Sequence, residues 1–266
     1  MQALHRKAKE LLESGRAKVI IGYGEGSGGK VRPVFIRNDA DVSLLLWDQR
    51  CRQNLAVYLA KPEIKKMGTP AIVTTPVVVR SIVQLIAERQ IKSTDLIALA
   101  IEDTDVTELT ENASLEKYVA SHPVGFPPHV TKEIETLRAM SIEERFTYWQ
   151  EELSRCFKCY ACRSSCPLCY CERCITECNQ PQWVNAAPHA LGNFEWHLNR
   201  AMHLAGRCVQ CGSCNIACPV GIPISLLTIE ASRIVEREFG QEAGTRCDMP
   251  AALSSFRVED KETFIL

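Results

Sequence analysis

The chain has 266 residues, 24% of them charged, and a formal net charge of −1 at pH 7. This length accommodates two domains, and the near-neutral charge gives no reason to expect nucleic acid or an anionic membrane surface as a partner. No apolar run approaches the roughly 18 residues that a membrane-spanning helix needs, and no signal peptide is recognised at the N-terminus. We therefore expect a soluble, cytoplasmic protein.

Residues 1–102 alternate between helical and extended patterns. Apolar spacing predicts helices at 3–12, 53–59 and 77–90 and strands at 18–22, 34–36, 44–47, 71–74 and 96–101. Strands that alternate with helices indicate a small α/β domain with a partly parallel sheet.

A glycine-rich loop lies inside this predicted domain. Gly24, Gly26 and Gly29 match the spacing of a dinucleotide fingerprint, and Lys30 completes most of a phosphate-binding loop. Both motifs require a helix directly after the loop, because its N-terminal amides face the phosphate. Here a strand pattern follows, and Val31 stands where a phosphate loop needs Ser or Thr. The sequence favours a flexible hairpin, with a flavin or nucleotide contact as the alternative.

The rest of the chain divides by composition. Residues 103–154 are polar and broken by prolines, which predicts a helical linker whose last helix leads to Cys156. A cysteine-rich domain at 155–239 and an irregular tail at 240–266 complete the predicted organisation. The expected fold class is α+β, with the α/β domain preceding the cysteine-rich domain, which has a helical insert.

Eight cysteines form two copies of one motif, C-x2-C-x2-C-x3-C-P. The copies are Cys156, Cys159, Cys162 and Cys166, and Cys208, Cys211, Cys214 and Cys218. This spacing holds cubane 4Fe-4S clusters, and in two-cluster ferredoxins the fourth cysteine of each motif ligates the cluster of the other. Disulfides suit such a dense set poorly in an intracellular chain, and structural zinc sites usually present two separated C-x2-C pairs. We therefore predict two 4Fe-4S clusters and a role in electron transfer, in an anaerobic or strongly reducing setting. Residues 155–239 are accordingly expected to form an iron–sulfur domain of ferredoxin-like fold.

Four more cysteines lie between the motifs: Cys169, Cys171, Cys174 and Cys178. They could hold a third cluster or a tetrahedral zinc, and iron–sulfur is slightly favoured. The alternative is that one or two of them are free buried thiols, and Cys178 is the weakest candidate ligand.

Other residues near the motifs could adjust a cluster. Arg155 and Arg207 precede the first cysteine of each motif, where a cation could raise the reduction potential, although a solvated arginine is the more common outcome. His189, His197 and His203 are expected to cap helices, pack or shape the cluster environment. Two further cysteines lie outside the motifs, at Cys51 and Cys247, and either is interpreted first as a small core residue, with remote ligation as the alternative.

Several stretches together resemble a known family. These are Leu11–Gly15 with Val19–Tyr23, Cys51–Leu59, Arg80–Ile86, and the cysteine segment from Arg155 to Cys171. The chain resembles the beta-subunit family of deazaflavin-reducing hydrogenases and formate dehydrogenases, most closely the bacterial branch found in heterodisulfide-reductase-like complexes.

The resemblance implies an electron-transfer subunit coupled to flavin or nicotinamide chemistry in neighbouring subunits. Members of the hydrogenase branch bind FAD. Related proteins commonly carry a Lys-Gly-Cys-Asp-type segment before the arginine that aligns with Arg80, whereas this chain has Thr74-Thr-Pro-Val-Val-Val. The N-terminal domain could accordingly serve as a docking scaffold without flavin.

Together these features predict an iron–sulfur relay subunit of a soluble multi-subunit oxidoreductase, with flavin- or molybdenum/tungsten-containing partners. No catalytic residues of its own are identified, so enzyme activity of the isolated chain stays open. The first alternative is an FAD-containing subunit that exchanges hydride with a nicotinamide or deazaflavin. The second is a structural adaptor whose metals only hold the fold.

Overall fold

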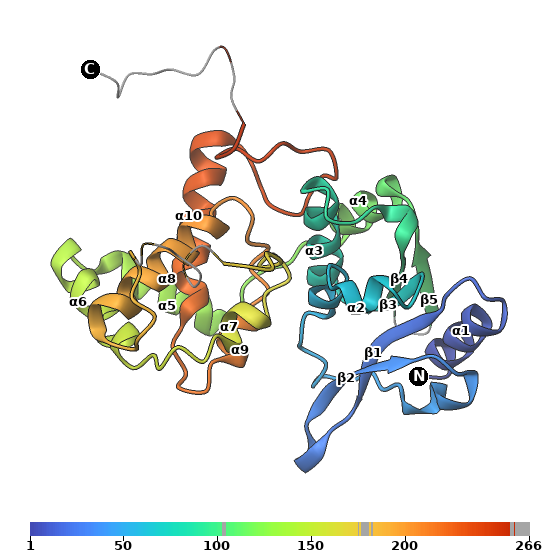
Figure 1. Ribbon diagram of the computed structural model, residues 1–266. Helices are drawn as coiled ribbons and strands as arrows, with labels where there is room; N and C mark the ends of the chain where they lie inside the picture. Colours follow the sequence, from blue (N-terminus) through green and yellow to red (C-terminus); the bar gives the residue numbers. More distant parts are fainter. Residues whose placement is uncertain (103–104, 175, 177–180, 182, 256–257, 259–266) are drawn as a thin grey trace.

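The computed structural model describes residues 1–102, 105–174, 176, 181, 183–255 and 258. They form an α+β protein in which a sheet domain precedes a mainly helical part that carries the cysteine motifs (Figure 1). The predicted fold class is confirmed. Within the described residues, no helix combines the length and apolar character needed to cross a membrane.

The N-terminal domain contains a five-stranded mixed sheet in the order β2-β1-β3-β4-β5. The central strands β1 (Val19–Glu25), β3 (Pro70–Thr74) and β4 (Ile97–Glu102) are parallel. The edge strands β2 (Val31–Ile36) and β5 (Asp105–Leu109) pair antiparallel to β1 and β4. Consecutive residues of β1 and β3 are buried, which is typical of parallel strands covered on both faces.

Two longer helices flank this sheet (Figure 1). Helix α1 (Gln2–Glu13) buries Leu4, Ala8 and Leu11, one stripe at helical spacing, as the sequence predicts. Helix α3 (Pro76–Ala87) begins where the hydroxyl of Thr75 accepts a hydrogen bond from the Val78 amide. The short helix α2 (Pro62–Lys65) precedes β3, and α4 (Asn112–Ser121) packs against α3.

Three predictions for this region were wrong in detail. The strand expected at 44–47 is absent: a 3₁₀ helix at Asp39–Leu44 is followed by one isolated bridge between Leu46 and Tyr23. The helix expected at 53–59 is only a 3₁₀ turn at Leu55–Tyr58. The predicted linker at 103–154 begins with β5, whose residues complete the sheet, because its alternating polar pattern is that of an edge strand with one face in water.

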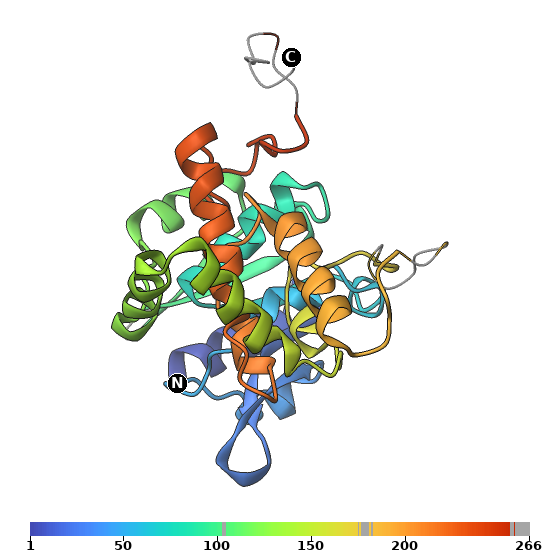
Figure 2. The same ribbon diagram turned by 90° about the vertical axis from the view of Figure 1, so that its left-hand side faces the viewer.

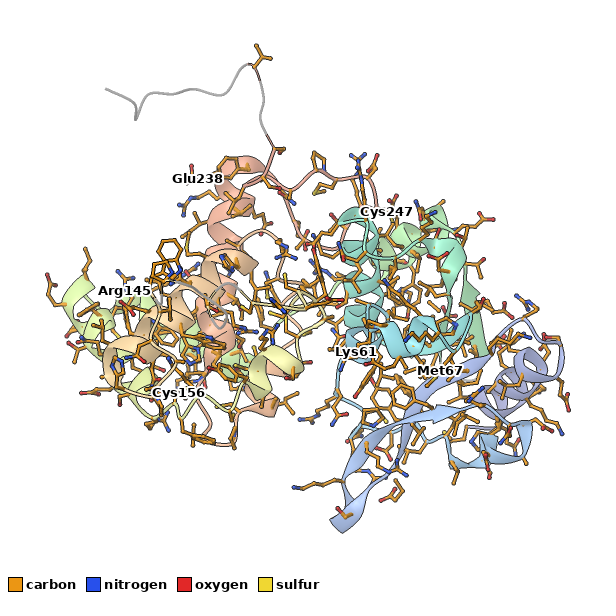
Figure 3. The ribbon with its side chains drawn as sticks, viewed as in Figure 1. Lys61, Met67, Arg145, Cys156, Glu238 and Cys247 are labelled. Atoms are coloured by element: carbon orange, nitrogen blue, oxygen red, sulfur yellow. The ribbon has the colours of Figure 1, made fainter. Side chains whose placement is uncertain are left out.

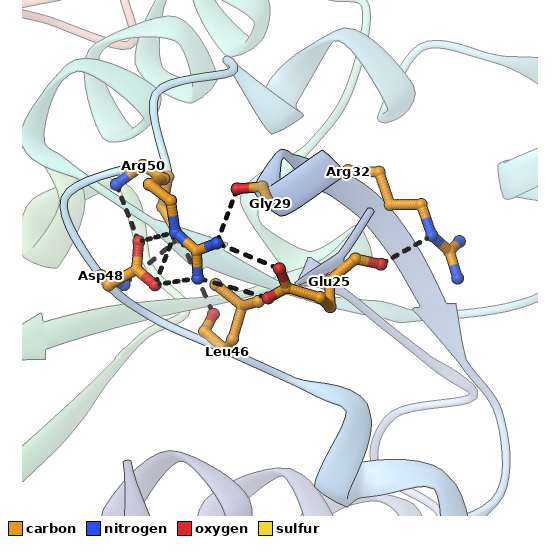
Figure 4. Close-up of polar contacts among 7 residues, drawn as sticks. Glu25, Gly29, Arg32, Leu46, Asp48 and Arg50 are labelled. Carbon is orange, nitrogen blue, oxygen red and sulfur yellow. Dashed lines mark hydrogen bonds and ion pairs between the residues drawn. The ribbon is translucent and has the colours of Figure 1, made fainter. Parts of the chain in front are cut away.

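The glycine-rich loop is a hairpin, as predicted. It joins β1 to β2 and protrudes from the domain in both views (Figures 1 and 2). The Gly26 amide donates to the carbonyl of Lys30 at 2.7 Å, so it does not face outward as a phosphate donor. The guanidinium of Arg50 donates to the Gly29 carbonyl at 2.7 Å and to the Glu25 carboxylate (Figure 4). The loop therefore presents oxygen atoms to a cation, whereas a phosphate-binding loop presents amide donors to an anion.

The described residues of the second part contain six helices. They are α5 (Pro128–Ala139), α6 (Ile142–Ser154), α7 (Ala161–Ser164), α8 (Ala190–Leu204), α9 (Ser213–Ala217) and α10 (Ile224–Phe239). Helix α8 packs against α6 and α10, and the short helices α7 and α9 contact each other. As predicted, α6 ends directly before Cys156.

The two parts share one apolar core and a polar contact. Leu168, Leu204 and Val209 belong to the same buried cluster as the sheet. Beside them, the guanidinium of Arg207 donates to both carboxylate oxygens of Glu88, at 2.8 and 2.6 Å. The cysteine motifs are therefore held against the N-terminal domain.

The described part of the tail also returns to the N-terminal domain, where Figure 3 places Cys247 beside α3. The Gly244 amide donates to the Gln84 side chain at 2.8 Å, and Arg80 donates to the carbonyl of Ala243 at 2.7 Å. Cys247 is buried in the core of that domain. The tail is therefore packed against the N-terminal domain as far as Cys247.

Candidate metal centres

The two cysteine motifs fold into the same loop. Lys158 and Tyr160 of the first motif and Gln210 and Gly212 of the second all adopt positive φ, between 56° and 70°. Three of the four have a side chain, so this backbone is costly and persists only where the surroundings require it. The conformation curls each C-x2-C-x2-C segment so that its three sulfurs can face one point, and a short helix, α7 or α9, follows.

Backbone amides in these loops point at the sulfurs. The Lys158 amide donates to the sulfur of Cys156 at 3.3 Å, and the Gln210 amide donates to that of Cys208 at 3.4 Å. These paired hydrogen bonds stabilise negative charge on sulfur, which is the form that ligates iron. The repeat in sequence is thus a repeat in geometry and electrostatics.

The fourth cysteine of each motif lies with the other motif. Cys218 lines a small cavity together with Cys156, Cys159 and Cys162. Conversely, the pKa of the Cys166 thiol is raised first by its hydrogen bond to Cys169 and by burial, and to a smaller extent by Cys211 of the second motif. Cys211 in turn acts on Cys214. These neighbours match the crossed pairing that two-cluster ferredoxins use, which would group the eight cysteines into two tetracysteine sets.

Within the described residues, no group of three or more His, Cys, Asp or Glu side chains converges tightly enough to hold a single metal ion. The ligands of a cubane cluster stand further apart than those of one ion, because iron and sulfide atoms lie between them. The donor set, four thiols at each place, matches the ligands of a 4Fe-4S cluster.

One face of α8 turns buried polar groups toward these sets. Asn193, Trp196, His197 and Arg200 lie at helical spacing and are each at most 5% exposed. The indole nitrogen of Trp196, both ring nitrogens of His197, and Nε and Nη1 of Arg200 make no hydrogen bond to any described residue. Buried donors without partners are costly, so this face fits a cavity that receives anionic sulfur and sulfide acceptors.

Burial makes the thiols hard to ionise without compensation. It raises the pKa of Cys162 to about 11 and moves that of Cys214 well above its ordinary value. Burial also lowers the pKa of His197 to about 4, so this imidazole is neutral near pH 7. Metal ions and fixed positive charge must therefore supply the compensation that keeps these sulfurs as thiolates.

Three of the four extra cysteines line one cavity of about 190 Å³. Cys169, Cys171 and Cys174 share it with Arg163, Arg200 and Arg207, among other residues. A hydrogen bond from the Cys166 thiol, together with the neighbouring arginines, lowers the pKa of Cys169 to about 6. Cys178 lies outside the described residues, so the complete set is not defined by the structure.

The arginines expected beside the clusters have other partners. Arg155 is exposed and pairs with Glu152, and Arg207 pairs with Glu88. The buried arginine between the cysteine sets is Arg200, which the sequence analysis missed. The pattern that could have indicated it is the distribution of residues on α8. This helix buries several polar residues, whereas its apolar residues Leu191, Leu198 and Met202 are exposed.

The remaining candidates also have defined positions. The His189 side chain caps α8 by accepting from the Gly192 amide at 3.2 Å, and His203 lies on the cavity of the extra cysteines. Cys51 is buried in the sheet domain, where its sulfur accepts from the Asp48 amide at 3.4 Å. The structure places both Cys51 and Cys247 in that core, as expected of small apolar residues.

Comparison with known proteins supports iron–sulfur binding in part of this site. Residues 169–223 match the family model of a 4Fe-4S dicluster domain, a span that includes the extra cysteines and the second motif but not the first motif. The F420-dependent formate dehydrogenase subunit beta of Methanocaldococcus jannaschii is 35% identical over 79 residues, which are 30% of this chain and 20% of that protein. F420-dependent formate dehydrogenase 1 subunit beta of Methanococcus maripaludis is 27% identical over 105 residues, 40% of this chain and 26% of that protein.

The chain thus carries an iron–sulfur dicluster segment of the kind used in electron transfer, and it is similar to part of formate dehydrogenase beta subunits. It matches only about a fifth to a quarter of the length of these relatives.

Proposed function

We propose that this protein is an iron–sulfur electron-relay subunit of a multi-subunit oxidoreductase. The observation that supports the proposal most is that Cys218 of the second motif lines one cavity with three cysteines of the first motif, because crossed pairing of this kind would hold two clusters within one small module. Bound clusters would supply reversible one-electron chemistry. The protein shell adjusts their potentials through burial, hydrogen bonds and charge.

The surroundings of the two sets differ in a way that suits a relay. Cys159 of the first set is exposed, beside the exposed ring of Phe157. The second set packs against the core of the sheet domain, to which Cys208 and Cys211 contribute. We infer that a cluster in the first set exchanges electrons with a partner protein at the surface. A cluster in the second set would then exchange electrons with the first one inside the protein.

A cleft of about 900 Å³ provides a second approach. It runs between the sheet domain and the second set, is lined by Lys61, Lys65 and Lys66, and reaches Cys166 and Cys171. Its lysines outnumber its acidic residues, so it suits the acidic surface of a redox partner.

Partner chemistry is inferred from the relatives. Their names describe formate dehydrogenase subunits, so we propose flavin- or molybdenum/tungsten-containing neighbours. Membership of the bacterial, heterodisulfide-reductase-associated branch and a cytoplasmic, anaerobic setting belong to the same proposal. The hairpin geometry around Arg50 gives no support to FAD binding at the glycine loop.

We also propose a third metal centre at Cys169, Cys171, Cys174 and Cys178. Its support is the shared cavity of three of these cysteines, whose arginines would balance the charge of a tetrathiolate centre.

Metal analysis of anaerobically purified protein tests these proposals. Two clusters require about eight iron and eight sulfide atoms per chain, and a third raises both to about twelve, whereas zinc would appear beside about eight iron atoms. Reversible bleaching by dithionite with paramagnetic signals would support the relay. Redox-silent metal would point to a structural adaptor, and a visible band from released flavin would point to an FAD-containing subunit. Colourless protein without sulfide would overturn the proposed function.

A further inference from the structure

One buried cation stands between the two tetracysteine sets. Arg200 of α8 is 5% exposed, and its Nη2 donates to the carbonyl of Cys162 at 3.0 Å. Its charge also acts on the thiols of Cys166 and Cys214. Cys162 belongs to the first set and the other two to the second, so a single guanidinium faces both.

Within the described residues, this charge has no carboxylate partner, and its ionisable neighbours are thiols. Among the ion pairs of the described residues, none includes Arg200, whereas Arg155 and Arg207 each have a carboxylate partner. Among the described residues, the thiols that face Arg200 are first Cys169, which hydrogen bonds to it, and then Cys166, Cys162, Cys214 and Cys208; the imidazole of His197 lies near as well. Nε and Nη1 also lack hydrogen-bond acceptors in the described protein. A buried, unpaired guanidinium is strongly unfavourable unless an anion is present beside it.

We propose that Arg200 is a shared positioning and tuning residue that raises the reduction potentials of both clusters together. The proposal rests on the proposed function, since it requires clusters in both sets. Each cluster with four thiolates is an anion that gains one further negative charge when an electron arrives. A fixed cation in a low-dielectric site stabilises the reduced form more than the oxidised form. Because Arg200 faces both sets, its removal must affect both.

The test compares Arg200→Gln and Arg200→Lys with the matched control Arg155→Gln in the full chain. Arg155 directly precedes the first motif but is exposed and paired. Iron and sulfide are counted first, and midpoint potentials are then measured by mediated titration with paramagnetic resonance detection. For Arg200→Gln we expect both clusters to become harder to reduce, each by about tenfold in the reduction equilibrium, or about 59 mV. The lysine variant should retain most of the native potential, and the control should match wild type.

The possible results separate the inference from the function on which it rests. Wild-type protein without clusters would refute the proposed function. Clusters present in Arg200→Gln with unchanged potentials, or a shift at one cluster alone, would refute the shared role of Arg200. If Arg200→Gln cannot hold iron, the Arg200→Lys variant tests the proposal instead. Full iron content with near-native potentials in Arg200→Lys supports the role of the charge. Lost iron in this variant, or a tenfold change in the reduction equilibrium of only one cluster, overturns it.

Discussion

Replacement of Glu88 by alanine probes how the sheet domain supports the cluster part. Glu88 follows α3, and its side chain is 9% exposed. It accepts two hydrogen bonds from Arg207 and one each from Tyr170, at 2.7 Å, and Gln84, at 2.8 Å. The truncation would leave these donors unpaired at the junction of the two parts.

The expected loss follows from the burial of the partners. Removing one member of a buried ion pair costs about 3–5 kcal/mol. The Arg207 side chain is 23% exposed and can regain some water, so we expect about 2–3 kcal/mol here. For a chain of this size that corresponds to a midpoint of thermal unfolding lower by about 5–10 °C. Because Arg207 precedes Cys208, a chelator should also remove iron faster from the variant.

Circular dichroism of the anaerobic protein measures the midpoint, and absorbance during chelation measures the iron loss. Arg246→Ala is the control, since its ion pair with Asp248 is exposed and should have no measurable effect. If Glu88→Ala and the control gave the same midpoint and the same rate of iron loss, the junction would not support the second set, and this reasoning would fail.

Three further perturbations follow from the same structure. Gly244→Ala should lower the free energy of unfolding by about 2–4 kcal/mol in denaturant titration, because φ is +74° and the new Cβ would meet the Arg80 carbonyl at 2.5 Å. An unchanged midpoint would show that the contact of the tail with the N-terminal domain does not stabilise the protein. Cys218→Ser should weaken the cluster of the first motif, and Cys166→Ser that of the second, as resolved by paramagnetic spectra; the reverse assignment would disprove the crossed pairing. Arg50→Ala should increase proteolysis of the β1–β2 hairpin without changing iron content, and a loss of iron would show that the hairpin is coupled to the clusters.

The sequence by itself indicated the chemistry of this protein. Two C-x2-C-x2-C-x3-C-P motifs predict iron–sulfur clusters because ligand type and spacing are local properties of the chain. The apolar stripes of α1 and α3 and the buried strands β3 and β4 were equally readable, since periodicity reports which face is covered. The glycine loop was correctly interpreted as a hairpin because a strand pattern follows it.

The tertiary structure decided what depends on distant neighbours. An edge strand such as β5 looks like a polar linker until β4 pairs with it. The tail looked irregular because its partners, Arg80 and Gln84, lie some 160 residues away. Arg200 was not singled out from the sequence, since only folding brings Cys169, Cys162, Cys166 and Cys214 around it. Spacing along the chain selects the ligands, but the field at a cluster is set by charges that meet only in three dimensions.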